Sequence, residues 1–314
     1  MKSGCTMPGM NEQLSLRSTP LAPGLPADED EFVVLDWGLF AGLACVWGSS
    51  FLLIARGLEA MPPGVVTFAR VGLGALVLAV LPRSSVRFEA VDRNKMIAMS
   101  LLWVAIPFTL FPIAEQYVNS AVAGLLNGAT PIVAALAAAA FWGRPPNRTQ
   151  WLGIAVGFLG IVMISAPSLS EGTNEAIGVV MVLSATVCYG VSVHMAPPLQ
   201  AKYGSVNVMA RMLALATLWS APWGLVGLPY VRFEWIPWLA VLLLGTVGTG
   251  LAFAMMAQLI KRVGSTRASL ITYLLPIVAL VLGVLINNDR VAPIAVGGVV
   301  LILAGAALAS RARR

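Results

Sequence analysis

The sequence predicts an all-α membrane protein of ten transmembrane helices, arranged as two inverted five-helix repeats. Three observations support this prediction. Of the 314 residues, 58% are hydrophobic and only 11% are charged, whereas a soluble domain has about 25% charged residues. Continuously apolar runs of about 20 residues, the length of a membrane-spanning helix, recur along the chain. The second half of the chain also repeats residues of the first half.

Ten apolar runs define the expected helices. Barrel strands are disfavoured because they would alternate polar and apolar residues over about ten positions. The connectors are short and contain turn-forming residues, as in Pro62-Pro63-Gly64. The expected spans are residues 36–55, 64–82, 96–115, 120–142, 150–167, 176–195, 206–228, 235–259, 268–287 and 292–310.

The chain divides into four parts. Residues 1–34 contain four prolines and an acidic run, and they predict a disordered cytoplasmic leader. Residues 35–167 hold the first five-helix repeat and residues 176–310 hold the second. Residues 311–314 form a basic tail, which is expected to be cytoplasmic.

The positions of the basic residues give the expected topology. With a cytoplasmic amino terminus, the cytoplasmic segments hold 15 of the 20 Lys and Arg residues, and the external loops hold three. Arg70 and Arg211 lie within spans. This bias follows the positive-inside rule and predicts a multi-pass protein of the cell membrane with both termini cytoplasmic. The same bias explains the net positive charge without a nucleic-acid partner. The basic residues determine the topology, and the expected partner is the lipid bilayer.

The two halves share residues in register. Pro-Ile-Val-Ala occurs at Pro131–Ala134 and again at Pro276–Ala279, an offset of 145 residues. The same offset relates Gly160 to Gly305. At slightly smaller offsets, the earlier spans match Trp47 to Tyr189 and Arg70 to Arg211. Five spans in each half give the halves opposite orientations, as in transporters that open a central site to each side in turn.

These motifs resemble the EamA branch of the drug/metabolite transporter superfamily. The resemblance rests on the run Trp47-Gly48-Ser49-Ser50-Phe51, on Arg70, on the repeated proline-centred spans and on a Gly-rich last span in each half. It covers about residues 36–310. The resemblance implies a secondary transporter that moves a small-molecule substrate, such as an amino acid, a related compound or a drug, usually outward by alternating access.

Charged side chains at membrane depth are the first candidates for a substrate site, because burying them is costly. Arg70 and Arg211 lie at mirrored depths and could hold an anionic group, or they could extend towards the membrane surface. Glu115, at the external end of the third span, could pair with Arg70 or carry a coupling proton, since burial favours the protonated carboxyl. It could equally anchor the helix at the interface.

Aromatic and amide residues complete the candidate site. Proline removes a backbone donor, so Pro131 and Pro276 should kink their helices and leave the carbonyls of Asn127 and Thr272 without a helical partner. This places a site between the fourth and ninth spans, unless the prolines only shape helix packing. The candidate substrate-binding residues are Trp47, Arg70, Glu115, Asn127, Tyr189, Arg211, Gln258, Thr272 and Tyr273.

Other chemistries find little support in the sequence. His194 is the only histidine, and it has no nearby cysteine or acidic cluster, so no metal and no cofactor are expected. The run Gly245–Gly250 resembles a phosphate loop but lacks the following Lys, and close helix packing is preferred. An enzyme is not expected. The alternatives are a membrane-embedded lipid-modifying enzyme and a non-transporting scaffold, and the oligomeric state considered is a homodimer.

Overall fold

The computed structural model describes residues 33–82, 87–143, 145–171 and 173–309. Within these ranges the chain is helical and contains no strand, so the predicted all-α class is confirmed. The basic tail and the expected leader, except its last two residues, lie outside the described ranges. In the described part of the chain, eight segments are long and apolar enough to cross a membrane, and two shorter apolar helices, Leu270–Ile286 and Pro293–Ala309, follow them.

The first half of the chain contains the helices that correspond to the first five expected spans. Pro63 begins α3 at a position where its missing N–H costs nothing. The helices are α1 (Val34–Gly48), α2 (Ser50–Leu58), α3 (Pro63–Val80), η1 (Ala90–Asp92), α4 (Arg93–Met99), η2 (Ser100–Ala105), α5 (Ile106–Ala114), α6 (Ser120–Asn127), α7 (Thr130–Trp142) and α8 (Arg148–Glu171).

The second half begins with a long helix and ends with a short one. Gly204 separates its first two helices and has a φ of 82°, which glycine adopts without strain. The helices are α9 (Thr173–Tyr203), α10 (Ser205–Gly227), η3 (Leu228–Tyr230), α11 (Trp235–Gly245), η4 (Thr246–Leu251), α12 (Ala252–Ala268), η5 (Ser269–Tyr273), α13 (Leu275–Ile286) and α14 (Pro293–Ala309).

Two π-helical segments each join two consecutive α-helices of the described chain. The segment η2 lies between α4 and α5, just before Pro107, which cannot donate to the ladder of the preceding turn. The segment η4 lies between α11 and α12, where Thr249 Oγ1 donates to the carbonyl of Leu244 at 2.9 Å. Single π-helical turns often occur at functional sites. The sequence reasoning did not anticipate either segment.

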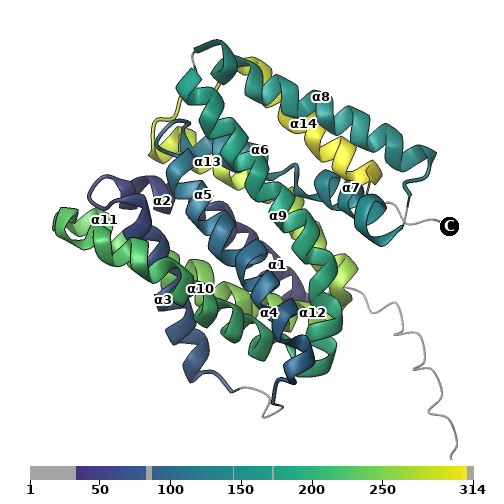
Figure 1. Ribbon diagram of the computed structural model, residues 1–314. Coiled ribbons are helices and arrows are strands. Elements are labelled where there is room, and N and C mark those ends of the chain that lie inside the picture. Colours follow the sequence, from purple (N-terminus) through teal and green to yellow (C-terminus); the bar gives the residue numbers. More distant parts are fainter. Residues whose placement is uncertain (1–32, 83–86, 144, 172, 310–314) are drawn as a thin grey trace, which may run out of the picture.

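Helices from the two halves pack against one another in pairs. Among the described helices, the pairs that occupy corresponding places in the two halves are α3 with α10, α6 with α13, and α8 with α14; α9 also packs against α5 and α7. Figure 1 shows α8 and α14 side by side along one edge of the bundle. Their backbones approach closely, since a Cβ on Gly305 would lie 2.4 Å from the backbone nitrogen of Gly157. This agrees with the role of small residues in packing membrane helices.

Gly245 and Gly250 also lie at a close helix contact. A Cβ on Gly245 would meet the Leu73 side chain at 2.6 Å, and one on Gly250 would meet Val77 at 2.5 Å. Both contacts are with α3. The helix-packing interpretation of the run Gly245–Gly250 is therefore confirmed.

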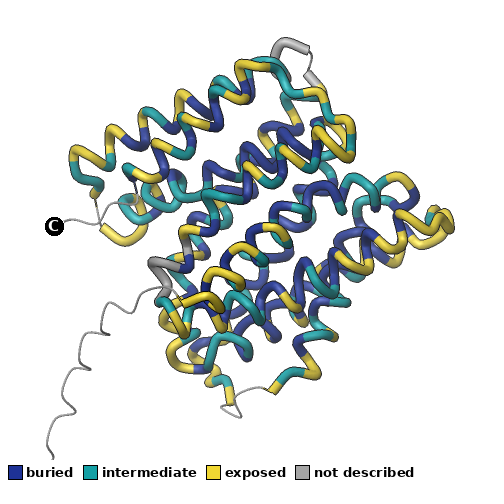
Figure 2. The backbone as a smooth tube through the Cα atoms, turned by 180° about the vertical axis from the view of Figure 1, so that it is seen from behind, coloured by how far each residue is buried: buried dark blue, intermediate teal, exposed yellow. Residues whose placement is uncertain are grey.

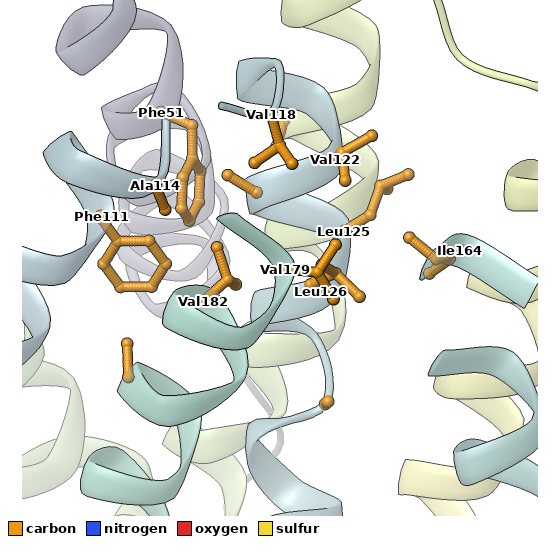
Figure 3. Packing of buried hydrophobic residues seen from close by; sticks show 14 of the residues in the cluster. Phe51, Phe111, Ala114, Val118, Val122, Leu125, Leu126, Ile164, Val179 and Val182 are labelled. Carbon is orange, nitrogen blue, oxygen red and sulfur yellow. The ribbon is translucent and has the colours of Figure 1, made fainter. Parts of the chain in front are cut away.

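Buried residues line the inside of the bundle and exposed residues line its outside (Figure 2). Many exposed side chains are large and apolar, including Leu76, Phe158, Leu218 and Trp235. A soluble protein rarely exposes so continuous an apolar surface, whereas lipid chains would cover it. The largest core cluster joins α2, α5, α6 and α9, where Phe51, Phe111, Val182 and Leu126 lie close together (Figure 3).

Candidate functional site

Arg70 is a buried cation in the middle of α3. Only 5% of the residue is exposed. Its Nε donates to Thr249 Oγ1 on η4 at 3.1 Å, and its Cζ lies 3.7 Å from the ring centre of Phe108 on α5. One turn earlier, Thr67 donates to the carbonyl of Phe108 at 2.8 Å and fixes α5 against α3.

This environment positions the charge of Arg70 without neutralising it. A hydroxyl and an aromatic face are both neutral partners for a guanidinium group. Among the residues that the structure describes, none forms an ion pair with Arg70 or accepts a hydrogen bond from its Nη atoms. Because a buried charge normally has a partner, Arg70 is suited to bind an anionic group.

Glu115 follows α5 and directs its carboxylate into the protein. Both oxygens, Oε1 and Oε2, are buried and have no hydrogen-bond partner among the described residues. The carboxylate interacts electrostatically with Arg70, but the two side chains form no ion pair within 4 Å. The expected direct pairing is therefore absent in this conformation. Burying a carboxyl group without a partner is costly, so a proton or a bound cation would stabilise it.

Tyr189 on α9 is the third member of this group. It interacts electrostatically with Arg70, and its ring stacks on Phe111 with 6.1 Å between the ring centres. Phe111 in turn meets Phe51 edge to face. Five residues form what is called here the central cluster. They are Arg70 on α3, Phe108 on α5, Glu115 directly after α5, Tyr189 on α9 and Thr249 on η4.

Trp47 and Asn127 have contacts with other residues. Trp47 on α1 packs edge to face on Phe253, with ring centres 6.1 Å apart. Asn127 ends α6, and its backbone carbonyl accepts a hydrogen bond from Thr130 Oγ1 at 2.8 Å. The expectation of a free carbonyl at Asn127 is therefore wrong, because the hydroxyl of Thr130 replaces the donor that Pro131 lacks.

The two prolines lie near the start of helices. Pro131 lies in the first turn of α7, after a break at Gly128 and Ala129, and Pro276 lies in the first turn of α13, after η5. Beside Pro276, Thr272 is half-buried, and Tyr273 donates to the carbonyl of Ala306 on α14 at 2.9 Å. The hydroxyl of Tyr273 therefore contacts α14 and not Arg70.

Two more candidates lie on the outside of the molecule. Gln258 is an exposed residue of α12. Arg211 is an exposed residue of α10, and its Cζ lies 4.3 Å from the ring centre of Phe88. The structure therefore does not bring Arg211 together with Arg70, although the sequence repeat aligns them.

His194 has a contact within the protein. Its Nε2 lies 2.9 Å from the carbonyl oxygen of Ala134, and its ring centre lies 5.0 Å from that of Trp142. It thus connects α9 with α7. Within the described ranges, no group of three or more His, Cys, Asp or Glu side chains could hold a metal ion.

The sequence reasoning missed Thr249 and Phe108. Thr249 lies in the glycine-rich run Gly245–Gly250, whose glycines indicate helix packing. A Thr hydroxyl at membrane depth is nevertheless a signal for a polar contact. Phe108 is one of several aromatic residues in an apolar helix, and no sequence signal distinguishes it.

Polar contacts join the helices at both ends of the bundle. At the end with the basic excess, Asp92 accepts from Lys202 at 2.8 Å and from the Tyr203 hydroxyl at 2.7 Å, and Asp36 pairs with Arg262. At the other end, Asp289 accepts from the backbone of Ala121 at 2.8 Å and from the Ser120 hydroxyl at 2.5 Å. Arg56 donates there to the carbonyl of Ile286 at 2.9 Å.

Comparison with known proteins agrees with this architecture. An uncharacterized transporter of Archaeoglobus fulgidus is 22% identical over 88% of this chain and 99% of its own length. The uncharacterized inner membrane transporter YedA of Escherichia coli is 26% identical over 82% of this chain and 85% of its own. A probable terminal-alkyne amino-acid exporter of Streptantibioticus cattleyicolor is 26% identical over 84% and 90%.

A solved crystal structure shares the fold. It superposes with a TM-score of 0.60 at 20% identity and covers 88% of this chain and 96% of that chain. The EamA-like transporter family matches the sequence twice, over residues 37–166 and 176–311, or once in each half. The chain is therefore a multi-pass membrane protein that belongs to the EamA-like transporter family.

Proposed function

We propose that this protein is a secondary transporter that moves a small organic metabolite across the cell membrane by alternating access, in the outward direction. The observation that carries this proposal is the central cluster, where a buried Arg70 without an anionic partner lies near the buried, unpaired carboxylate of Glu115. Charged groups inside a membrane protein commonly mark a substrate or ion pathway. The family and its transporter relatives support the same function.

The proposed architecture is ten transmembrane helices in two inverted repeats, residues 35–167 and 176–310, with both termini cytoplasmic. Three pairs of corresponding helices pack together, α3 with α10, α6 with α13, and α8 with α14. The π-helical segments η2 and η4 also occupy corresponding places, beginning at Ser100 and Thr246. The two shorter apolar helices supply the ninth and tenth spans, since α14 has 17 residues and a span needs at least about 17.

Within this site, Arg70 binds the anionic group of the substrate. Its guanidinium group can offer two parallel hydrogen bonds to a carboxylate or a phosphate. Glu115 meets a cationic group of the substrate or a coupling proton, and Tyr189 interacts electrostatically with Arg70. An amino acid would supply both an anionic and a cationic group, and one relative is described as a probable amino-acid exporter.

Alternating access requires the contacts at one end to open while those at the other hold. On the cytoplasmic side these are the Asp92–Lys202 and Asp36–Arg262 pairs, and on the external side they are the hydrogen bonds of Asp289 and Arg56. Each set joins helices of different spans. The carboxylates of Asp92 and Asp36 are buried, whereas their cationic partners Lys202 and Arg262 are partly exposed to water. Exposure to water weakens an ion pair.

A metabolite screen tests the transport function. Cells that express the protein are compared with cells that carry an empty vector and with cells that express Arg70→Gln, and metabolites are measured inside and outside the cells. The probes added are the proteinogenic amino acids and one terminal-alkyne amino acid. We expect at least one metabolite to accumulate outside only with the wild-type protein. Equal distributions in all three strains would overturn the proposal.

A further inference from the structure

A cavity of about 450 Å³ lies between α4 and α10, at the end where both helices begin. It is separate from the central cluster and shares no residue with it. Two of its lining residues are arginines, and most of the others are apolar. The lining residues are Phe88, Glu89, Ala90, Arg93, Met96, Ile97, Arg211, Ala214 and Leu215, called here the α4–α10 groove.

The groove carries two unneutralised positive charges. Arg93 and Arg211 are both exposed, and within the described ranges neither forms an ion pair or a side-chain hydrogen bond. The one acidic residue of the groove, Glu89, pairs with Lys202 at 2.9 Å. Lys202 also pairs with Asp92 at 2.8 Å, and Asp92 pairs in turn with Lys95 at 3.5 Å. Two lysines thus balance these two carboxylates, and the groove as a whole attracts anions.

The guanidinium group of Arg211 is held in place by a stack of rings. It lies over one face of Phe88, and the other face of Phe88 stacks on Tyr203 with 3.8 Å between the ring centres. The Tyr203 hydroxyl donates to Asp92 at 2.7 Å, which anchors the stack to the start of α4. An arginine that is already ordered loses less entropy when it binds an anion.

The groove continues onto an apolar face of α10. Ala214, Leu215 and Leu218 follow Arg211 at helical spacings of three, four and seven residues, so all lie on one face. Leu218 is 69% exposed. Across the groove, Met96 and Ile97 form the wall on α4. The cationic entrance therefore leads along an exposed, lipid-facing apolar track towards the centre of the membrane.

We infer that the α4–α10 groove binds an anionic phospholipid, with its phosphate between Arg93 and Arg211 and an acyl chain along Leu215 and Leu218. Arginine matches the geometry of a phosphate group. Basic pockets between transmembrane helices on the cytoplasmic side are typical sites for anionic lipid headgroups. The groove lies at the end that carries the basic excess, and the inference does not depend on which substrate is transported.

Native mass spectrometry of the purified full-length protein tests this inference. The protein in detergent is titrated with dioleoyl phosphatidylglycerol and, separately, with the zwitterionic dioleoyl phosphatidylcholine. We expect a bound phosphatidylglycerol on the wild-type protein and a loss of about tenfold or more in its affinity in Arg93→Gln/Arg211→Gln. Phosphatidylcholine binding should be weak for both proteins.

Two matched variants identify the cause of any change. Lys261→Gln/Arg148→Gln removes the same charge from exposed residues outside the groove and should keep phosphatidylglycerol bound as in the wild type. Arg93→Lys/Arg211→Lys keeps the charge but loses the planar guanidinium groups, and it should restore only part of the binding. Equal binding of the two lipids to the wild-type protein, or an equal loss in the Lys261/Arg148 variant, would overturn the inference.

Discussion

Arg70 on α3 and Arg211 on α10 are aligned by the sequence repeat, and their helices pack against each other, yet their guanidinium groups lie in different surroundings. Arg70 is buried against Phe108 and Thr249 and interacts electrostatically with Glu115, whereas Arg211 is exposed and lies over Phe88. Each cation lies over an aromatic ring. The two sites differ in what surrounds the ring, and therefore in what each arginine can bind.

The difference follows from the residues that the repeat does not conserve. Counting from the starts of η2 and η4, Trp103 takes the place that corresponds to Thr249, and Lys261 takes the place that corresponds to Glu115. Arg211 therefore has neither the hydroxyl nor the carboxylate that surround Arg70. The comparison indicates that two residues aligned by the sequence repeat can lie in different surroundings, one buried and one exposed.

The largest effect expected is on transport after loss of the buried charge. Arg70→Gln should lower substrate flux by at least about tenfold, because a hydrogen bond to a charged group contributes about 1.5–3 kcal/mol. Arg211→Gln should keep more than half of the flux. Flux is measured as export of the metabolite found by the screen, at equal amounts of membrane protein. An equal loss in both variants would remove the distinction between the two arginines.

Glu115→Gln should abolish flux driven by a pH gradient, because Gln mimics the protonated carboxyl and cannot release a proton. Substrate exchange without a gradient should continue if the coupling ion is a proton. The measurement uses proteoliposomes with and without an imposed pH gradient. Glu175→Gln, at the start of α9, serves as the control. Unchanged gradient-driven flux in Glu115→Gln would rule out a proton-coupling role.

Removal of the two aromatic rings should give smaller changes, each in a different quantity. Phe108→Leu should raise the KM for substrate about two- to fivefold, because it removes a cation–π contact worth about 0.5–1 kcal/mol. Phe88→Leu should leave KM unchanged and weaken phosphatidylglycerol binding. KM is measured in proteoliposomes and lipid binding by native mass spectrometry. An equal KM for the two variants would show that Phe108 does not position Arg70 for substrate.

A pair of glycine variants separates effects on packing from effects at either arginine. Gly305→Ala should lower the melting temperature in detergent by a few degrees, because overpacking costs about 1–3 kcal/mol. Gly38→Ala should raise it slightly, since a Cβ added at this position would have nothing within 4 Å and Ala favours a helix. Neither change should alter the KM for substrate. A lower melting temperature for Gly38→Ala would contradict the packing account.

Much of the fold could be predicted because the bilayer imposes simple rules on the sequence. Continuous apolar runs locate the helices, and Pro131 and Pro276 lie where the structure interrupts its α-helices. The π-helical segments could not be predicted, because they depend on a local shift in the hydrogen-bond ladder. The hydroxyl of Thr130, which fills the gap at Asn127, also requires side-chain geometry.

The candidate site could be predicted only in part. The cost of burying charge singles out Arg70 and Glu115, and the structure brings both together with Tyr189. The Thr249 partner of Arg70 is 179 residues away in sequence, and only the packing of η4 on α3 reveals it. For Arg211, the sequence predicts the position along the helix. Whether its side chain is buried or exposed depends on how the neighbouring helices pack around α10.

The binding of the exported metabolite to purified protein tests the central claim most directly, because it separates recognition from the later steps of transport. Ligand that binds the folded state raises its melting temperature. The substrate should raise the melting temperature of the wild-type protein and of Arg211→Gln by similar amounts, and it should leave that of Arg70→Gln unchanged. Equal stabilisation of Arg70→Gln and the wild type would contradict a substrate site at Arg70.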